Sequence, residues 1–467
     1  MRSHNQQITE ILKTLSEAQE KQLYSLCQEC AEKLIDFVAK YKSNDAPIIE
    51  LLEEYFRLLF LAHKNEISVK VLKKHFVKVE KYFNTAVKNE KWVVAFFPYK
   101  ASMWDCMESV WFAAKDNPEC CVYVIPIPYY DYLIDGQLGQ MHYEGELLPD
   151  YVPITDWKDY NKGSINPDIA FIHNPYGKEN VLTCIPENFQ AANLRNNVSL
   201  LSFLPYTIHR GSVVREAHIT TGGVLLSDIV FVQSDSIRQQ YINHLFELTG
   251  KQPGAMDVLN SKIIALGSPK ADKIINSKQF NYAIPDEWNS VATGKRVIFF
   301  NTSIGAMLNN TMDDDDTYLV SLKLILNYFK SCDTAILLWR PHPLFEQTFH
   351  SMRPNHLDEY LKIRDSFINE GYGIYDETAD LHRAIHFSDA YFGDSSSVIP
   401  LFLISGKPYQ LHDHINKDIL PNFIENIENE IVNNDTRKEE YCGKFLAESS
   451  GQAGKKIFEH VMSRVGT

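Results

Sequence analysis

The chain opens with a long stretch in which apolar residues recur at helical spacing. Between residues 7 and 90 they fall on one face of a 3.6-residue turn, as in Ile8, Ile11, Leu12 and Leu15, and no glycine interrupts them. This periodicity predicts amphipathic helices.

After residue 91 the pattern changes to short apolar runs, most of them continuous rather than alternating. Continuous runs of this length are typical of parallel strands that are buried on both faces of a sheet. We predict one set of strands at 92–97, 121–126, 168–172, 199–204, 228–233 and 262–266, and a second set at 296–301, 334–340, 372–376, 389–394 and 407–411.

Helical patterns lie between several of these runs, the clearest at 105–115, 234–248, 317–328 and 397–404. Alternating strands and helices predict open, doubly wound sheets, so we expect an α/β fold with two such sheets in series. We divide the chain into a helical N-terminal region (1–90), a first α/β domain (91–268), a second α/β domain (269–436) and a helical C-terminal segment (437–467). The last segment could pack on either domain.

Composition and charge limit the classes of protein to which this chain can belong. Of the 467 residues, 45% are hydrophobic and 23% charged, as in ordinary globular proteins. Lys and Arg number 46 and Asp and Glu 60, a net charge of −14, which argues against a general nucleic-acid binder because such proteins neutralise phosphates. The eight cysteines are scattered, no long apolar run occurs and the N-terminus is polar. We therefore expect a cytoplasmic protein without a transmembrane helix.

Ligands of doubly wound sheets bind outside the carboxyl ends of the strands, so residues just after strands are the candidates for a site. The strongest candidate is GDSSSV at 393–398, where a strand ends and a helix is expected to begin. Backbone N–H groups, the helix dipole and the hydroxyls of Ser395, Ser396 and Ser397 would together bind phosphate oxygens. The alternative is ordinary capping of the helix, for which one serine is enough.

The loop WRPHPL, after the second strand of the second set, carries another candidate. Its prolines stiffen the chain and fix the directions of Arg340 and His342. A guanidinium beside an imidazole suits a diphosphate, whereas the alternative is a surface loop with a satisfied histidine. Thr302 and Ser303 are weaker candidates for the same phosphates, because their spacing to the neighbouring glycine matches no P-loop.

Two strands of the first set end in a histidine. A histidine in this position is well placed to take a proton from the hydroxyl of an acceptor, so His173 and His209 are candidate bases. A single histidine in such a position more often has a structural role than a catalytic one. Lys100, after the first strand, and Asn174, beside His173, are candidate acceptor-binding residues.

No metal site is expected. His382 and His386 have the i, i+4 spacing of metal ligands but lack an adjacent Glu. Cys27 and Cys30 form a CxxC pair without the second pair that a zinc site needs.

Residues 64–91 hold eight Lys against three Glu, interleaved with apolar residues. A basic amphipathic helix of this kind could lie on an anionic membrane surface. The commoner meaning is a solvated helix face, and both interpretations stay open.

Three stretches of the second half carry a family resemblance when they are taken together. They are LGSPKAD at 266–272, RPHP at 340–343, and SD at 388–389 followed by GDSSSV at 393–398. They are similar to the G-[YS]-P-[RK]-x-D, K/R-x-H-P and S-D-x-x-x-T-D-Y-S-S-V segments of the CDP-glycerol glycerophosphotransferase family, which includes the teichoic acid polymerases. The three segments keep the family's order and approximate spacing over roughly residues 200–400, which is less than half of the chain.

This resemblance implies a GT-B-like arrangement of two tandem Rossmann-like domains, with the acceptor at the first and a CDP-activated donor at the second. It implies that His342, Ser396 and Ser397 hold donor phosphates. The family's base lies in a W-H-G-T segment, which matches IHRGS at 208–212 and makes His209 our first candidate. In this chain Arg210 is inserted into that segment, and the arginine of the family's T-x-R segment is absent.

We therefore predict a transferase that moves glycerol phosphate or a related phospho-alcohol from a CDP-activated donor to a hydroxyl of a cell-surface glycan or its precursor, releasing CMP. Its partners would be that donor, a glycan or lipid-linked glycan acceptor and, as an open option, the inner face of the membrane. Arg, His and a helix dipole would neutralise the diphosphate, so no metal or other cofactor is required. Two alternatives remain, a GT-B glycosyltransferase that uses a nucleotide-sugar and a non-catalytic nucleotide-binding protein.

Overall fold

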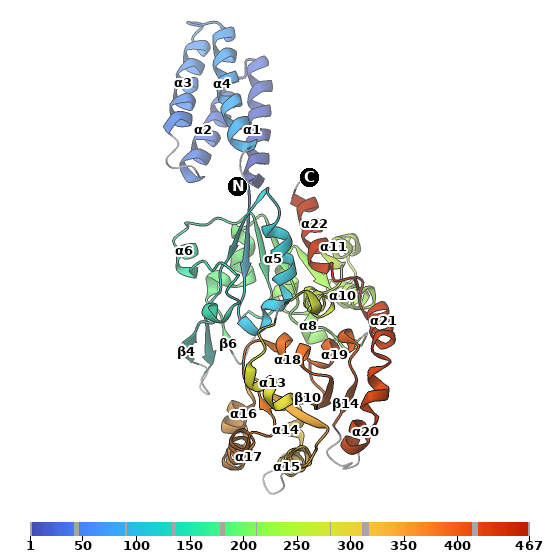
Figure 1. The fold of residues 1–467 in the computed structure, drawn as a ribbon. Coiled ribbons are helices and arrows are strands. Elements are labelled where there is room, and N and C mark those ends of the chain that lie inside the picture. The colour runs from blue at the N-terminus through green and yellow to red at the C-terminus, as the bar shows by residue number, and fades with distance from the viewer. Residues whose placement is uncertain are drawn as a thin grey trace.

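The computed structural model describes residues 2–41, 46–88, 91–132, 137–177, 183–211, 213–280, 282–310, 317–412 and 419–465. These residues form three parts that follow one another along the length of the molecule (Figure 1): a helical bundle, an N-lobe built on the first set of strands and a C-lobe built on the second.

Four helices form the bundle, as the periodicity between residues 7 and 90 predicts. Their apolar faces meet in one core, in which Leu12, Leu34, Leu52 and Leu72 are buried. The helices are α1 (Arg2–Glu20), α2 (Tyr24–Tyr41), α3 (Ala46–His63) and α4 (Val69–Lys88).

Six parallel strands form the sheet of the N-lobe, in the order β2-β1-β5-β7-β8-β9. Ala95 and Phe96, neighbours on β1, are both buried, and they belong to the separate apolar cores on the two faces of the sheet. The apolar runs are therefore continuous because both faces of the sheet are buried, as we predicted. The strands are β1 (Trp92–Phe97), β2 (Cys120–Val124), β5 (Ile169–Ile172), β7 (Leu200–Phe203), β8 (Ile229–Val232) and β9 (Ile263–Ala265).

Helices connect these strands and cover both faces of the sheet. The helix predicted at 105–115 is shorter than expected, because a 3-10 turn, η1 (Ala101–Cys106), precedes it. The helices of the N-lobe are α5 (Glu108–Lys115), α6 (Trp157–Asn161), α7 (Ala191–Asn197), α8 (Glu216–Ile219), α9 (Gly222–Leu226), α10 (Asp235–Leu248) and α11 (Ala255–Lys262).

A small antiparallel sheet, in the order β4-β3-β6, was not predicted. Its strands are only four, five and two residues long, so no continuous apolar run marks them in the sequence. They are β3 (Tyr129–Tyr132), β4 (Leu138–His142) and β6 (Thr183–Cys184).

Five parallel strands form the sheet of the C-lobe, in the order β12-β11-β10-β13-β14. The strands are β10 (Arg296–Thr302), β11 (Ala335–Pro341), β12 (Ile374–Tyr375), β13 (Ala390–Gly393) and β14 (Tyr409–Leu411). The helices are α13 (Asp286–Ala292), α14 (Ile304–Asn310), α15 (Thr317–Lys330), α16 (Phe345–Met352), α17 (Leu357–Glu370), α18 (Leu381–Phe387), α19 (Ile399–Ser405) and α20 (Ile419–Ile431).

Three helices tie the lobes together: α12 (Pro269–Ile275), α21 (Asn434–Phe445) and α22 (Ala453–Val465). The final helical segment divides between the lobes, because α21 packs against α19 of the C-lobe and α22 against α5 of the N-lobe. Asp272 of α12 connects α22 with α5. Its carboxylate accepts the N–H groups of Ala453 at 3.0 Å and Gly454 at 2.8 Å, and the hydroxyl of Ser109 at 2.8 Å.

Both large sheets are doubly wound, and the structure therefore has the GT-B-like arrangement of two Rossmann-like domains behind a helical N-terminal region. Residues that follow strands of the N-lobe contact the C-lobe directly. His382 of α18 is hydrogen-bonded to Asp105, and Arg210 to Tyr409. The loops after β1 and β7, which hold Lys100 and His209, thus lie at the boundary between the lobes.

Candidate functional site

The order of the C-lobe strands reverses between β10 and β13. The chain runs from β10 through β11 to β12, and then returns to the other side of β10 with β13. At such a reversal the loops after the two strands separate, and this crevice is where doubly wound sheets bind ligands. The loops here are residues 302–303 and 394–397, which hold the threonine and all the serines predicted to bind phosphate.

Gly393 and Asp394 fix the start of the serine loop, residues 395–397. Gly393 has φ 151°, and a Cβ at this position would lie 2.5 Å from the carbonyl oxygen of Asn301, so only glycine allows β13 to approach β10 this closely. The buried carboxylate of Asp394 accepts the N–H of Ser303 at 2.7 Å and the hydroxyl of Tyr318 at 2.9 Å. Asp394 therefore ties the two loops of the crevice together.

The serine loop presents hydroxyls at the surface of the lobe. Ser395 and Ser397 are exposed, and Ser396 is half-buried. The Oγ of Ser396 accepts the N–H of Val398 at 3.3 Å and lies 3.4 Å from the hydroxyl of Tyr391. The predicted helix begins at Ile399, two residues later than expected, because Ser396 makes a turn before it.

Thr302 and Ser303 are buried below this loop. The Oγ1 of Thr302 accepts the indole N–H of Trp339 at 3.3 Å, and the Oγ of Ser303 accepts the N–H of Ala306 at 3.2 Å. Both hydroxyls are thus engaged within the lobe, where they hold the end of β10 and the start of α14.

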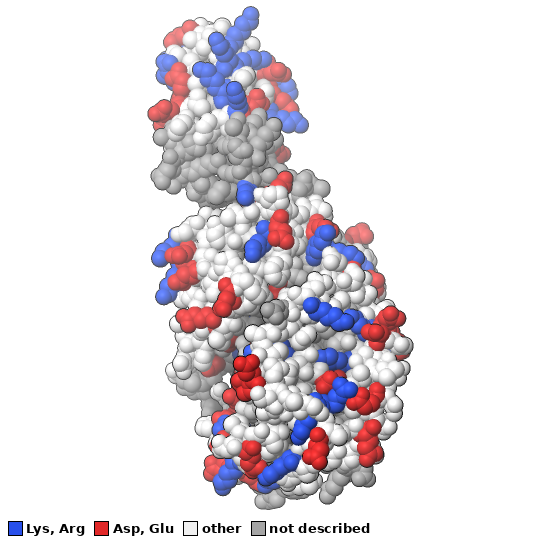
Figure 2. Space-filling view, viewed as in Figure 1, with Lys and Arg blue, Asp and Glu red and all other residues white. Residues whose placement is uncertain are grey.

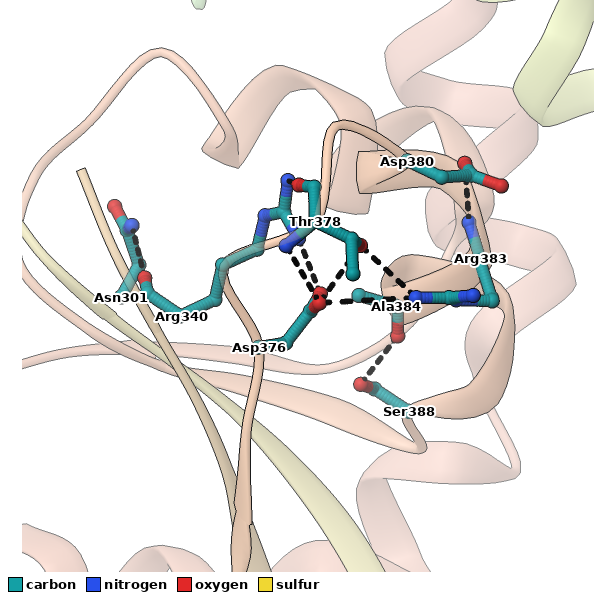
Figure 3. A network of polar contacts seen from close by, with 8 residues as sticks. All are labelled: Asn301, Arg340, Asp376, Thr378, Asp380, Arg383, Ala384 and Ser388. Atoms are coloured by element: carbon teal, nitrogen blue, oxygen red, sulfur yellow. Dashed lines mark hydrogen bonds and ion pairs between the residues drawn. The ribbon is translucent and has the colours of Figure 1, made fainter. Parts of the chain in front are cut away.

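Arg340 is buried inside the C-lobe. Its guanidinium points toward Asp376 and Thr378 (Figure 3). Its guanidinium is paired with the buried carboxylate of Asp376 and donates to the carbonyl oxygen of Thr378. A buried guanidinium needs such a counter-charge, because an unpaired one would lose its hydration without compensation. Asn301 holds the same strand by donating to the carbonyl oxygen of Arg340 at 2.8 Å. We predicted that Arg340 points toward a ligand, whereas here it joins β11 to the segment after β12.

His342 is exposed beyond the end of β11, and it lies near Lys100 of the N-lobe. The backbone N–H of His342 donates to the carbonyl oxygen of Thr302 at 3.0 Å, and the Nδ1 of its ring accepts the backbone N–H of Leu344 at 3.1 Å. Partial desolvation of the imidazole lowers the pKa of His342, and the positive charge of Lys100 lowers it further. The Nζ of Lys100 also lies 4.7 Å from the ring of Tyr129. Two predicted site residues from different lobes are therefore brought together.

His209 lies after β7 and is held through its backbone. Its N–H donates to the amide oxygen of Gln233 at 2.6 Å, and its carbonyl oxygen accepts from Gln233 at 3.1 Å and from the hydroxyl of Tyr441 at 3.1 Å. Burial and the neighbouring His218 lower the pKa of His209 to about 4. The imidazole is consequently neutral at pH 7 and able to accept a proton.

Arg210, which sequence reasoning noted only as an insertion, reaches from the N-lobe to β14. Its Nη2 donates to the hydroxyl of Tyr409 at 3.4 Å, and its guanidinium lies 5.6 Å from the same ring. Burial raises the pKa of Tyr391, and the positive charge of Arg210 opposes that rise. Arg210 is thus an exposed cation against β14, the strand that pairs with β13 ahead of the serine loop.

His173 and Asn174 are buried at the end of β5. The Nε2 of His173 accepts the N–H of Tyr99 at 2.8 Å, and burial lowers its pKa to about 3. The side chain of Asn174 closes a turn, since it exchanges two hydrogen bonds of 3.3 Å with the backbone of Tyr176. Both residues shape the loops around Lys100, and His209 is the more accessible of the two candidate bases.

A cluster of buried charges that no sequence motif predicts lies between the lobes. Asp105 accepts from His382 at 2.6 Å and is paired with Lys270 at 3.1 Å, and nearby Lys273 is paired with Glu108 at 3.0 Å. The partners lie far apart in the sequence, so no local motif marks them.

The described ranges contain neither a metal-binding cluster nor a membrane-spanning helix. No group of three or more His, Cys, Asp or Glu side chains there could hold a metal ion. None of the helices in the same ranges is long and apolar enough to cross a membrane.

Comparison with known proteins gives structural neighbours alone. No family model and no curated protein matches the sequence. Among solved structures, a putative UDP-N-acetylglucosamine 2-epimerase from Listeria monocytogenes aligns with 80% of this chain and 96% of its own, at 13% identity and a TM-score of 0.49. The wall teichoic acid polymerase TagF aligns over 91% and 98%, at 11% identity and a TM-score of 0.49. A UDP-GlcNAc 2-epimerase from Neisseria meningitidis, bound to UDP-GlcNAc, aligns over 79% and 99%, at 13% identity and a TM-score of 0.44.

Proposed function

We propose that this protein is an enzyme that transfers a phospho-alcohol group, such as glycerol phosphate, from a CDP-activated donor to a hydroxyl of a cell-surface glycan or its precursor. The observation that carries the proposal is the exposed serine loop at the reversal between β10 and β13, in a lobe that Arg210 of the opposite lobe contacts through Tyr409. Hydroxyls and a guanidinium at such a reversal suit the oxygens of a diphosphate. The CDP part rests on the family resemblance of the sequence.

In this proposal the donor binds to the C-lobe. Ser395, Ser396 and Ser397 donate to the phosphate oxygens, while Arg210 and His342 approach from either side. Arg210 takes the role that the sequence suggested for Arg340, whose guanidinium already neutralises Asp376. Arg340, Thr302 and Ser303 act on the donor indirectly, by holding the loops that contact it.

The transfer needs a base and an in-line attack. His209 takes the proton from the acceptor hydroxyl, and the oxygen attacks the distal phosphorus of the donor. A new P–O bond forms to the acceptor, the bond to the bridging oxygen breaks and CMP leaves with that oxygen. His209 then loses its proton to solvent. His173, Lys100 and Asn174 shape the acceptor side, and the reaction requires no metal ion.

The proposal places the protein in the cytoplasm, with the bundle near the inner face of the membrane. Helix α4 supports this location, because Lys70, Lys74 and Lys78 are exposed on it together with Val71 and Val77. Figure 2 shows Lys and Arg side chains gathered at the end of the bundle that lies far from the lobes. Lysines around exposed apolar residues suit anionic lipid headgroups.

Nucleotide binding tests the donor site without a known acceptor, because a ligand of the folded state raises the melting temperature. We expect CMP and CDP to stabilise the protein more than UMP, UDP or GDP do, with and without Mg²⁺. Arg210→Ala should weaken CDP binding about tenfold, since a hydrogen bond to a charged group contributes roughly 1.5–3 kcal/mol.

Arg215→Ala is the matched control, because Arg215 is exposed on the same segment and its loss changes the net charge equally. CDP should bind this variant as it binds the parent. A preference for UDP or GDP would redirect the proposal to a nucleotide-sugar glycosyltransferase. No stabilisation by any of the five nucleotides would refute the donor site.

A further inference from the structure

A cavity of about 550 Å³ lies between the lobes, apart from the crevice of the serine loop. Its walls come from η1 of the N-lobe, from the segment between the lobes and from the start of α18 in the C-lobe. The residues that matter most for its chemistry are Trp104, Asp105, Tyr151, Phe280, Tyr282 and His382. Nothing in the proposed transfer uses this space so far.

Four of these side chains keep a buried polar atom without a hydrogen-bond partner among the described residues. The atoms are the indole N–H of Trp104, Oδ1 of Asp105, the hydroxyl of Tyr282 and Nδ1 of His382. Trp104, Asp105 and His382 are each at most 4% exposed. An unsatisfied buried polar group costs about 1–3 kcal/mol, and these four belong to residues that line one cavity, so a polar ligand that reached them there would recover part of that cost.

The charges around the cavity favour a neutral ligand over an anion. Asp105, Asp380 and Lys273 line it, but Lys273 is already paired with Glu108 at 3.0 Å. Asp105 is neutralised by Lys270 at 3.1 Å, and burial lowers the pKa of His382, which keeps that imidazole neutral. The lining therefore offers donors and acceptors without a spare positive charge, which suits a neutral ligand.

The aromatic residues add apolar surface to these polar atoms. The side chains of Trp104, Tyr151, Phe280 and Tyr282 all line the cavity. A sugar unit combines both requirements, because its ring has apolar C–H faces while its hydroxyls donate and accept hydrogen bonds. The volume lies within the usual range for small-molecule sites, roughly 300–1,000 Å³.

We propose that this cavity binds a neutral sugar unit, and that in the reaction this unit belongs to the acceptor. The assignment of the sugar to the acceptor rests on the proposed transfer, whereas sugar binding itself does not. Hydroxyls of the sugar would bond to Asp105 and Trp104 from the N-lobe and to His382 from the C-lobe. Because the binding groups come from both lobes, the sugar would hold the lobes together while the donor occupies the serine loop.

Titration of the full chain with simple sugars tests the proposal. The probes are the methyl glycosides of glucose, galactose and N-acetylglucosamine, with inorganic phosphate as the anionic comparison, and binding is followed by saturation-transfer NMR. At least one glycoside should bind, and phosphate should not compete with it. Tyr282→Phe and Trp104→Phe each remove one hydrogen-bonding group and keep an aromatic ring, so each should weaken that glycoside about five- to tenfold.

Tyr55→Phe is the control for the tyrosine variant, because Tyr55 is buried in the bundle, away from the cavity. It should bind the glycoside as the parent does. The proposal is overturned if no glycoside binds, if phosphate competes, or if the cavity variants bind as tightly as Tyr55→Phe. CDP binding by the parent separates the two proposals: sugar binding without CDP binding refutes the transfer alone, and CDP binding without sugar binding refutes the cavity alone.

Discussion

His173 and His209 both follow strands of the N-lobe, yet their surroundings give them different chemistry. The imidazole of His173 has no exposed surface and accepts an N–H through Nε2. His209 is half-buried, and its backbone is held by Gln233 and Tyr441. The first histidine therefore stabilises a loop, while the second keeps a side chain that a substrate can approach.

The buried His173 should make the protein sensitive to acid. Its pKa is 6.5 ordinarily and about 3 in the fold, so as pH falls the unfolded chain takes up the proton first. Its contribution to stability is constant above about pH 6.5 and is lost progressively between about 6.5 and 3. His173→Gln, whose amide oxygen can still accept the N–H of Tyr99, should remove about 1.4 kcal/mol per pH unit from the slope below pH 6.

Urea unfolding at pH 7, 6, 5 and 4 measures this slope. His350→Gln is the control, because His350 is exposed on α16, and it should leave the slope as in the parent. Equal slopes for His173→Gln and the parent would show that burial of this imidazole does not limit stability in acid.

Local sequence patterns predict the loops of the site but not the direction of every side chain. An arginine after a strand suits a diphosphate, yet the partner that turns Arg340 inward, Asp376, lies 36 residues away. Arg210 interrupts the family's motif, and it reaches the opposite lobe. Such pairings depend on how distant segments meet, which local patterns do not report.

The serine loop depends on the backbone of β13 as much as on its hydroxyls. Gly393→Ala should destabilise the C-lobe by about 1–3 kcal/mol, because the new Cβ would lie 2.5 Å from the carbonyl oxygen of Asn301. The displaced loop should also bind CDP more weakly. Thermal unfolding and CDP titration measure the two effects.

Gly443→Ala is the matched control for this change. Gly443 lies exposed within α21, and nothing would contact an added Cβ within 4 Å. This variant should gain about 0.5–1 kcal/mol, because alanine favours a helix over glycine. If both alanines affected stability alike, the close approach of β13 to β10 would not matter.

The strands and helices themselves were largely predictable. Every predicted strand is present within a few residues, because parallel strands buried on both faces leave continuous apolar runs such as those of β1 and β10. The small sheet of β3, β4 and β6 was missed since short strands leave no such signal. The helix at 397–404 was placed two residues early, because the turn made by Ser396 precedes it.

The exposed face of α4 should bind anionic membranes. Replacing Lys70, Lys74 and Lys78 together by glutamine should weaken binding to phosphatidylglycerol-containing vesicles about a hundredfold, since each lysine near such a surface contributes roughly 1 kcal/mol. Co-sedimentation with vesicles measures this, and added salt should weaken binding by the parent.

A second triple variant controls for the change in net charge. Lys362, Lys444 and Lys455 are exposed on the C-lobe and on α22, far from α4 along the chain. Replacing them by glutamine should leave vesicle binding unchanged. Equal losses for the two triple variants would mean that total charge matters, and not the face of α4.

The two lobes meet through side chains that also belong to the proposed sites. Asp105 with His382 lines the cavity, and Arg210 with Tyr409 joins the lobes at β14, which pairs with the strand that leads into the serine loop. Any opening of the lobes would therefore alter the donor site and the cavity together. The proposed transfer would therefore depend on how the two lobes are arranged.

The chemical step itself is tested most directly by following CDP-glycerol with ³¹P NMR in the presence of methyl glycosides as acceptors. The account predicts that the diphosphate signals are replaced by those of CMP and of a new phosphodiester, and that His209→Ala stops this conversion while His218→Ala does not. Release of CDP, an unchanged donor, or conversion by His209→Ala at the parent's rate would contradict it.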